Sequence, residues 1–178
     1  MRPSITLDVD STGRKILRYK CEGIDVAELG NKFRHQNVCS VSRPAAQSLR
    51  QSWLAWLHLA SGDVIEFSSS CTQVVGWQEI GSLNIRVIAD VLRGLPQVAA
   101  SVAKIAISQF RIDQIDVLIY EDEDVVSECG IVFCEAGGSE IVVATGISPG
   151  SVSLAVPQQT EDFDPEFALV MCHRARLA

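Results

Sequence analysis

The chain lacks the sequence signatures that would assign it a chemistry. Its six cysteines include no Cys-x-x-Cys pair, and no group of cysteines and histidines has zinc-ligand spacing. No Gly-x-Ser-x-Gly elbow, P-loop or Gly-x-Gly-x-x-Gly turn is present. The densest acidic run, at residues 121–124, lacks the spacing of an EF-hand loop. We therefore expect no metal and no cofactor, and no class of enzyme is favoured.

Long apolar runs are also missing. A membrane-spanning helix needs about 20 mostly apolar residues, and the most apolar window, residues 88–107, contains Asp90, Arg93, Pro96 and Lys104. The first residues contain no apolar stretch of signal-peptide length. We therefore expect the cysteines to be free thiols in a reducing cytoplasm, several of them buried as small hydrophobic side chains.

Positive charge is scarcer than negative charge. The 178 residues include 15 Lys and Arg against 22 Asp and Glu, which gives a net charge of −7. Because such a surface repels phosphates, we expect neither a nucleic-acid partner nor a membrane partner. Solubility alone can explain this charge, but a basic protein partner would also suit it. The length fits one domain over residues 1–178, in which residues 157–178 form a loosely attached C-terminal segment.

Two stretches of the chain share one pattern. Residues 57–68 and 132–145 each contain an apolar run, a turn of small residues, an acidic residue and a second apolar run. Each is followed by a Gly-Ser pair that opens a further strand, at residues 81–87 and 150–156. An old internal duplication would explain the likeness, and so would the preference of turns for Gly and Ser. Either way, each stretch predicts a hairpin followed by a third strand.

Helical patterns are fewer than strand patterns. Asp25 has the position of an N-cap for a short amphipathic helix over residues 25–36. Pro44 can begin a second helix, and apolar side chains recur at helical spacing over residues 96–105. Residues 167–174 fit a helix and an edge strand equally well. The sequence thus predicts a β-rich α+β fold, mainly antiparallel, with two or three helices covering the sheets.

Four residues are candidates for a catalytic centre assembled from distant parts of the chain: His58, Cys71, Glu79 and Glu128. His58 lies in an apolar run, where a hydrogen-bonded core histidine is the simpler interpretation. Cys71 follows three serines and is the thiol to test first, although no basic residue lies near it in sequence to lower its pKa. A hydrolase-like enzyme therefore stays an alternative to a protein without catalysis.

A protein-binding module is the function that the sequence favours. The run Glu121, Asp122, Glu123 and Asp124 is either a solvated loop or a docking surface that would attract a basic partner. Trp77 is either an interface anchor or a plug that closes one end of the core. An immunity-type or inhibitory partner of a basic protein is one form of this hypothesis, since carboxylates can take the place of phosphates. A homo-oligomeric structural protein is the remaining alternative, suggested by the positive mean hydropathy.

Overall fold

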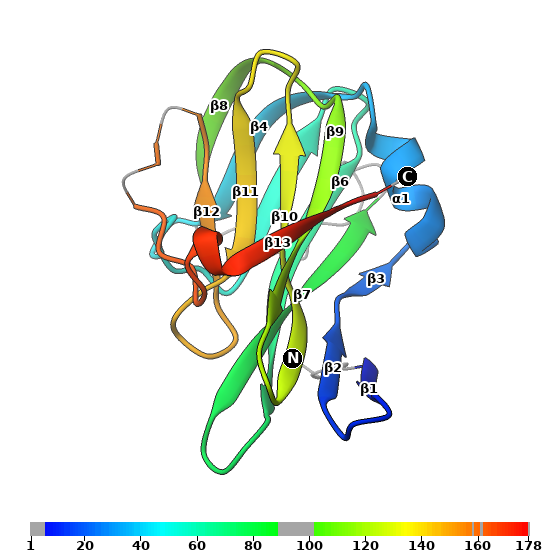
Figure 1. Cartoon of the computed structure of the whole chain (residues 1–178). Coiled ribbons are helices and arrows are strands. Elements are labelled where there is room, and N and C mark those ends of the chain that lie inside the picture. The colour runs from blue at the N-terminus through cyan, green and yellow to red at the C-terminus, as the bar shows by residue number, and fades with distance from the viewer. Residues whose placement is uncertain (1–5, 89–101, 158, 161, 178) are drawn as a thin grey trace.

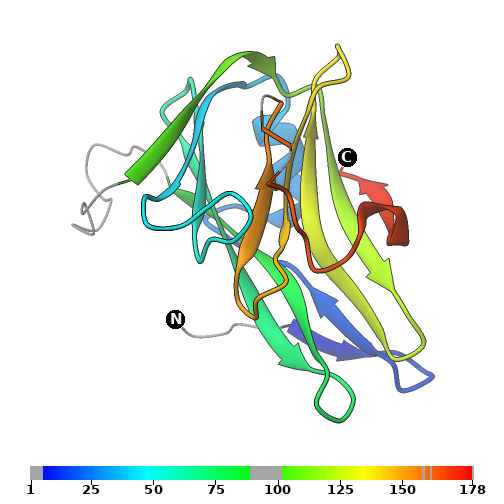
Figure 2. The same ribbon diagram turned by 90° about the vertical axis from the view of Figure 1, so that its left-hand side faces the viewer.

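The chain folds into two β-sheets that pack face to face. The structure, a computed structural model, describes residues 6–88, 102–157, 159–160 and 162–177. Sheet A contains β1 (Thr6–Val9), β2 (Lys15–Arg18), β9 (Gln114–Glu121), β10 (Val125–Cys134), β11 (Glu140–Thr145), β12 (Val152–Ala155) and β13 (Cys172–Arg176). Sheet B contains β3 (Lys20–Glu22), β4 (Asn37–Pro44), β5 (Ala55–Leu59), β6 (Val64–Gln73), β7 (Glu79–Ile88) and β8 (Val102–Arg111). Figures 1 and 2 show the two layers.

Both sheets are mixed because the N-terminal strands join them in parallel. In sheet A, β10 pairs with β9 along one edge, and along its other edge with β2 in parallel and then with β11 antiparallel. Sheet B has the order β3-β7-β6-β5-β4-β8, in which β3 is parallel to β7 and the other pairs are antiparallel. Only Tyr19 separates β2 from β3, so one stretch of chain crosses from sheet A to sheet B.

The main core lies between the sheets, because alternate side chains of each strand point inward. Phe67 of β6 and Phe133 of β10 are each 1% exposed, and their rings meet edge to face with centroids 6.1 Å apart. This geometry is favourable for aromatic pairs. Leu29 and Phe33 of the helix α1 (Val26–Phe33) belong to the same cluster. The helix therefore closes part of the core that the two sheets leave open.

A second apolar cluster lies on the outer face of sheet A, under the C-terminal segment. The ring of Phe167 stacks on Tyr120 of β9, with centroids 3.9 Å apart and planes 9° from parallel. A 3-10 helix, η2 (Leu169–Met171), leads into β13, which pairs with β9 at the edge of the sheet. Of the two interpretations of residues 167–174, the edge strand describes their last part. Loose attachment of residues 157–178 stays a prediction.

Both predicted hairpins are confirmed. β5 and β6 form the first, and β7 follows as the third strand against β6. β10 and β11 form the second, and β12 follows against β11. The two three-stranded units lie in different sheets. The cap at Asp25 is also confirmed, since its carboxylate accepts a hydrogen bond from the Ala27 amide at 2.8 Å.

The prediction of an α+β fold with two or three covering helices is wrong, because the described residues form mostly β-strands in two mixed sheets. Within the described residues the only α-helix is α1, whose 8 residues are too few to cross a membrane. Pro44 ends β4 and begins a turn, in which its carbonyl accepts a hydrogen bond from the Gln47 amide at 3.0 Å. Residues 102–105 belong to β8, where Ile105 lies opposite Val41 of β4. Pairing with β4 thus overrides the local helical spacing. Residues 96–101 lie outside the described part of the chain.

We expect Phe67→Ala to lower the free energy of unfolding by about 3–5 kcal/mol, because it removes a buried ring and leaves a cavity between the sheets. Urea unfolding followed by circular dichroism would measure the change. Trp77→Ala is the control, since that side chain is 95% exposed and its loss should change stability by less than about 0.5 kcal/mol. Equal losses from both variants would contradict the importance of the aromatic pair.

Candidate functional site

Three turns meet at one end of the sandwich, which lies at the bottom of Figures 1 and 2. They are the β1–β2 turn (residues 10–14), the β6–β7 turn (residues 74–78) and the β9–β10 turn (residues 122–124). We call this surface the turn end, and we include in it Lys15, Glu79, Glu121 and Val125, which flank the turns. The acidic run and Trp77, which the sequence suggested separately as contact residues, both belong to it.

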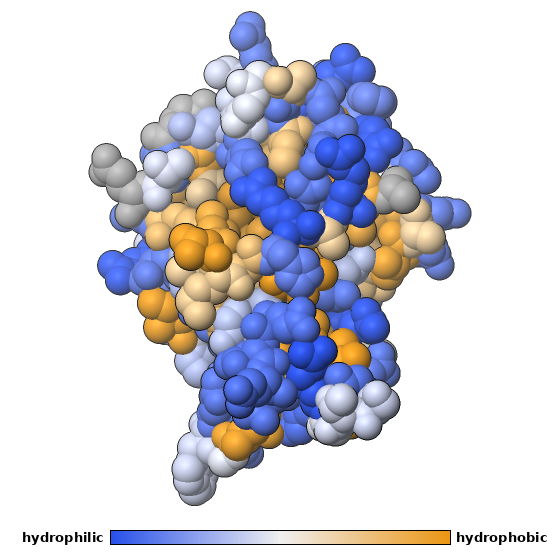
Figure 3. Space-filling model, in the orientation of Figure 1, coloured by the Kyte–Doolittle hydropathy of each residue, from blue (hydrophilic) through white to orange (hydrophobic). Residues whose placement is uncertain are grey.

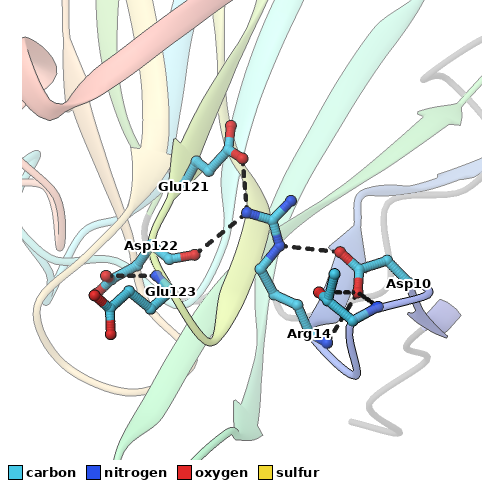
Figure 4. A network of polar contacts seen from close by, with 6 residues as sticks. Asp10, Arg14, Glu121, Asp122 and Glu123 are labelled. Carbon is cyan, nitrogen blue, oxygen red and sulfur yellow. Dashed lines mark hydrogen bonds and ion pairs between the residues drawn. The ribbon is translucent and has the colours of Figure 1, made fainter.

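Arg14 connects the first turn to the acidic run (Figure 4). Its Nη1 lies 2.7 Å from a carboxylate oxygen of Glu121, and its Nε lies 3.2 Å from Asp10. The hydrogen bond to Glu121 raises the pKa of the Arg14 guanidinium. A hydrogen bond from the Thr12 hydroxyl lowers the pKa of Asp10 to about 2, so this carboxylate is charged at neutral pH. Arg14 therefore joins the two turns, and its positive charge is paired with the carboxylates of Asp10 and Glu121.

Lys15 connects the other two turns. Its backbone amide donates to the carbonyl of Asp124 at 3.1 Å. Its ammonium donates to the carbonyls of Gln73 and Val74 at 2.7 and 3.1 Å. The β6–β7 and β9–β10 turns are thus held side by side by a single residue.

The acidic run presents negative charge to solvent. Asp122 uses its carboxylate within the run, accepting hydrogen bonds from the Tyr120 hydroxyl at 3.0 Å and from the Glu123 amide at 2.7 Å. The side chains of Glu123 and Asp124 are exposed and form no hydrogen bond or ion pair with any described residue. These two carboxylates are therefore available to a partner.

Trp77 is not a core plug, because 95% of its side chain is exposed. It lies in a turn in which the Val75 carbonyl accepts a hydrogen bond from the Gln78 amide at 2.9 Å. Gly76 has a φ of +54°, a conformation that glycine adopts without strain. In Figure 3 the tip of this end is pale, with orange atoms beside it and blue over most of its surroundings. The turn thus presents a large aromatic side chain to solvent beside the acidic run.

His58 and Glu128, two of the catalytic candidates, lie in different sheets. Each is held by hydrogen bonds to its neighbours in space. Nε2 of His58 lies 2.6 Å from the hydroxyl of the buried Ser42, and burial lowers the pKa of this histidine. Glu128 accepts hydrogen bonds from the Tyr19 amide at 2.7 Å and from Arg18 at 3.3 Å, while burial raises its pKa. The geometry of both residues is that of structural groups.

Cys71 and Glu79, the other two candidates, are neighbours on β6 and β7, with the thiol sulfur 3.6 Å from a carboxylate oxygen. Burial, reinforced by the negative charge of Glu79, raises the pKa of Cys71 to about 11. A nucleophilic thiol needs the opposite shift. The four candidates thus lie in three separate places, and the described residues hold no cluster of three or more His, Cys, Asp or Glu suited to a metal ion.

Sequence reasoning missed a groove on the outer face of sheet B. Its volume is about 560 Å³, and β3, β6 and β7 line it together with Trp53 and Gly150. Its polar side chains come from the consecutive strands β6 and β7 and from β3, which lies far from them in the sequence. Only the alternation over residues 81–87 hinted at a polar face. No family model, curated protein or solved structure matches the chain. The chemistry of the turn end and of the groove is therefore the basis for assigning a function.

We expect Cys71 to react slowly with iodoacetamide at neutral pH, because a thiol with a pKa of about 11 is almost wholly protonated there. Glu79→Gln should accelerate the reaction, since it removes the negative charge that disfavours the thiolate. Peptide mapping by mass spectrometry would give the rates. Cys21, whose pKa is also raised to about 11 chiefly by burial, is the internal control and should not change. A Cys71 rate that Glu79→Gln leaves unaltered would contradict this electrostatic account.

Proposed function

We propose that this chain is a non-catalytic protein-binding module whose turn end contacts a basic protein. The observation that carries the proposal is the exposure of Trp77 on a turn that Lys15 joins to the turn of the acidic run. A solvated tryptophan at a turn contributes nothing to the core, whereas tryptophan is strongly enriched among the residues that dominate binding energies. The half-exposed Val75 lies two residues away and adds apolar surface.

The charge of the turn end supports a basic partner. Its turns and flanking residues contain six acidic residues against Arg14 and Lys15, and both of these bases are already occupied by contacts within the surface. Bringing Glu123 and Asp124 against an apolar surface would remove water from unpaired charges at a high cost. Lysine and arginine side chains on the partner would offset that cost and would also speed the encounter.

The contacts within the turn end also favour binding. Arg14 and Lys15 fix the three turns relative to one another before any partner arrives, so less conformational freedom is lost on association. A rigid surface with an aromatic tip and carboxylates suits a basic cleft of the kind that binds polyanions. An inhibitory or immunity-type role is the form of the proposal that follows from this fit. Since all six cysteines are free thiols, a reducing cytoplasm is the compartment we propose.

We expect Trp77→Ala to weaken binding by about 2 kcal/mol, roughly a thirtyfold rise in Kd. The tagged chain would capture its partner from the native host, and calorimetry with the purified partner would then give Kd. Trp53→Ala is the matched control, because Trp53 lies outside the turn end and loses an aromatic ring of the same size.

Equal affinities of the two tryptophan variants would contradict a contact at the turn end. So would light scattering that shows a dimer of the wild-type chain and a monomer of Trp77→Ala, because the surface would then serve self-association. Val170 and Met171 on the C-terminal segment are 93% and 57% exposed. A dimer unaffected by Trp77→Ala would direct the homo-oligomer hypothesis to that surface instead.

We expect the double variant Glu123→Lys with Asp124→Lys to lower the association rate constant about tenfold at low salt and to flatten its dependence on ionic strength. Both side chains are exposed, so the fold should be preserved. Surface plasmon resonance over a range of salt concentrations would measure the rate. The control, Glu135→Lys with Asp162→Lys, changes the net charge equally but lies outside the turn end. Indistinguishable salt dependences for the two double variants would count against electrostatic steering by the acidic run.

A further inference from the structure

The groove on sheet B is a second surface that the proposed function does not use. Its volume of about 560 Å³ is in the range of small-ligand sites, and it shares no residue with the turn end. Its lining side chains include Glu66, Ser68 and Asn84, which alternate along β6 and β7 with the core residues Phe67 and Ile85. The groove therefore lies on the face of sheet B that points away from the core.

The floor of the groove can both donate and accept hydrogen bonds. The Asn84 amide donates to the Ser70 hydroxyl at 2.7 Å, and Ser68 lies on the same face of β6. A hydroxyl group can donate or accept, and a side-chain amide offers a donor and an acceptor, whereas an ionised side chain offers only one of the two roles. A ligand with several hydroxyl groups could pair with them in more than one direction.

The charged side chains of the groove balance one another. Lys20 pairs with Glu22 on β3, and Arg86 lies 3.7 Å from Glu66. The second oxygen of the Glu66 carboxylate accepts a hydrogen bond from the Trp56 indole at 2.8 Å. With two positive and two negative groups paired, the groove has no net charge that would attract a charged ligand. The lining thus favours a neutral polar ligand.

Trp53 gives the groove an aromatic wall. Its side chain is 46% exposed, and the Gln47 side chain fixes its backbone by accepting a hydrogen bond from the Trp53 amide at 2.9 Å. Gly150, with a φ of +77°, lies against the ring, so that a β-carbon there would be 3.5 Å from the indole. The ring is therefore positioned before any ligand arrives, with nearly half of its surface open to solvent.

We propose that this groove binds a short neutral saccharide. A sugar ring combines hydroxyl groups, which Ser68 and Asn84 can bind, with an apolar face of C–H bonds, which stacks on an indole such as that of Trp53. An extended peptide fits less well. The edge of β6 beyond Phe67 has no β5 partner, but Ser69 and Ser70 are only 5% and 3% exposed, which hinders backbone pairing with an added strand.

Calorimetry and amide NMR with a defined set of probes would test the proposal: maltotriose, cellotriose, lactose and N,N′-diacetylchitobiose as neutral saccharides, 3′-sialyllactose as a charged one, and a Ser-Ala repeat peptide. We expect at least one neutral saccharide to bind with a Kd of about 1 mM or lower, a modest affinity. Its amide shift changes should map to β3, β6 and β7. Trp53→Ala should weaken that binding at least tenfold, whereas Trp77→Ala should leave it unchanged.

Trp53→Phe keeps an aromatic ring and should retain part of the affinity, which separates stacking from a loss of fold. The shift map of the wild-type chain needs no variant and so tests the site even where a variant fails to fold. The proposal is overturned if no neutral saccharide binds, if shifts map outside the groove, or if only 3′-sialyllactose or the peptide binds. Each of these results would leave the proposed role of the turn end standing, because Trp77 and the acidic run are tested separately.

Discussion

The burial of two apolar sheet faces against each other is the constraint on which the rest of the structure depends. Phe67 and Phe133 lie at the contact between the sheets, and water is excluded around both rings. Once these faces are buried, only the ends of the sandwich and the outer faces of the sheets remain for function. The turn end lies at one end of the sandwich, and the groove lies on the outer face of sheet B. Both surfaces therefore consist mainly of side chains that the core does not require.

One continuous segment, residues 15–22, contributes a strand to each sheet. It pairs as β2 with β10 of sheet A and, after Tyr19, as β3 with β7 of sheet B. At this crossing the Glu128 carboxylate accepts a hydrogen bond from the Tyr19 amide. The amide of this residue, which lies between the two strands, therefore has a partner. The same segment brings Lys15 to the turn end and Lys20 to the groove. One crossing thus contributes to the stability of the sandwich and to both candidate surfaces.

The local sequence pattern is sufficient to predict those elements whose structure depends on residues close together in the sequence. The two hairpins, the third strand after each and the cap at Asp25 all follow from alternation and turn residues. The pattern over residues 102–105 was misleading, because the partner that makes it a strand is β4, which lies far away in the chain. The sequence is equally compatible with Trp77 in the core and on the surface, since hydrophobicity alone does not show whether a turn residue faces the core or solvent. The groove needs β3 and Trp53 beside the β6–β7 hairpin, and Arg14 needs Glu121. Only the fold brings these residues together, so no local signal could reveal either arrangement.

The parallel pairing of β2 with β10 also determines when the fold can be completed. It brings residues 15–17 against residues 125–127, so the β1–β2 pair has no place in sheet A until residues 125–127 have left the ribosome. Contacts between such distant parts of a chain slow folding, because a long loop must close before they form. β1 and β2 are synthesised well before β10, yet they are among the last elements to be secured, and their edges need protection in the interval.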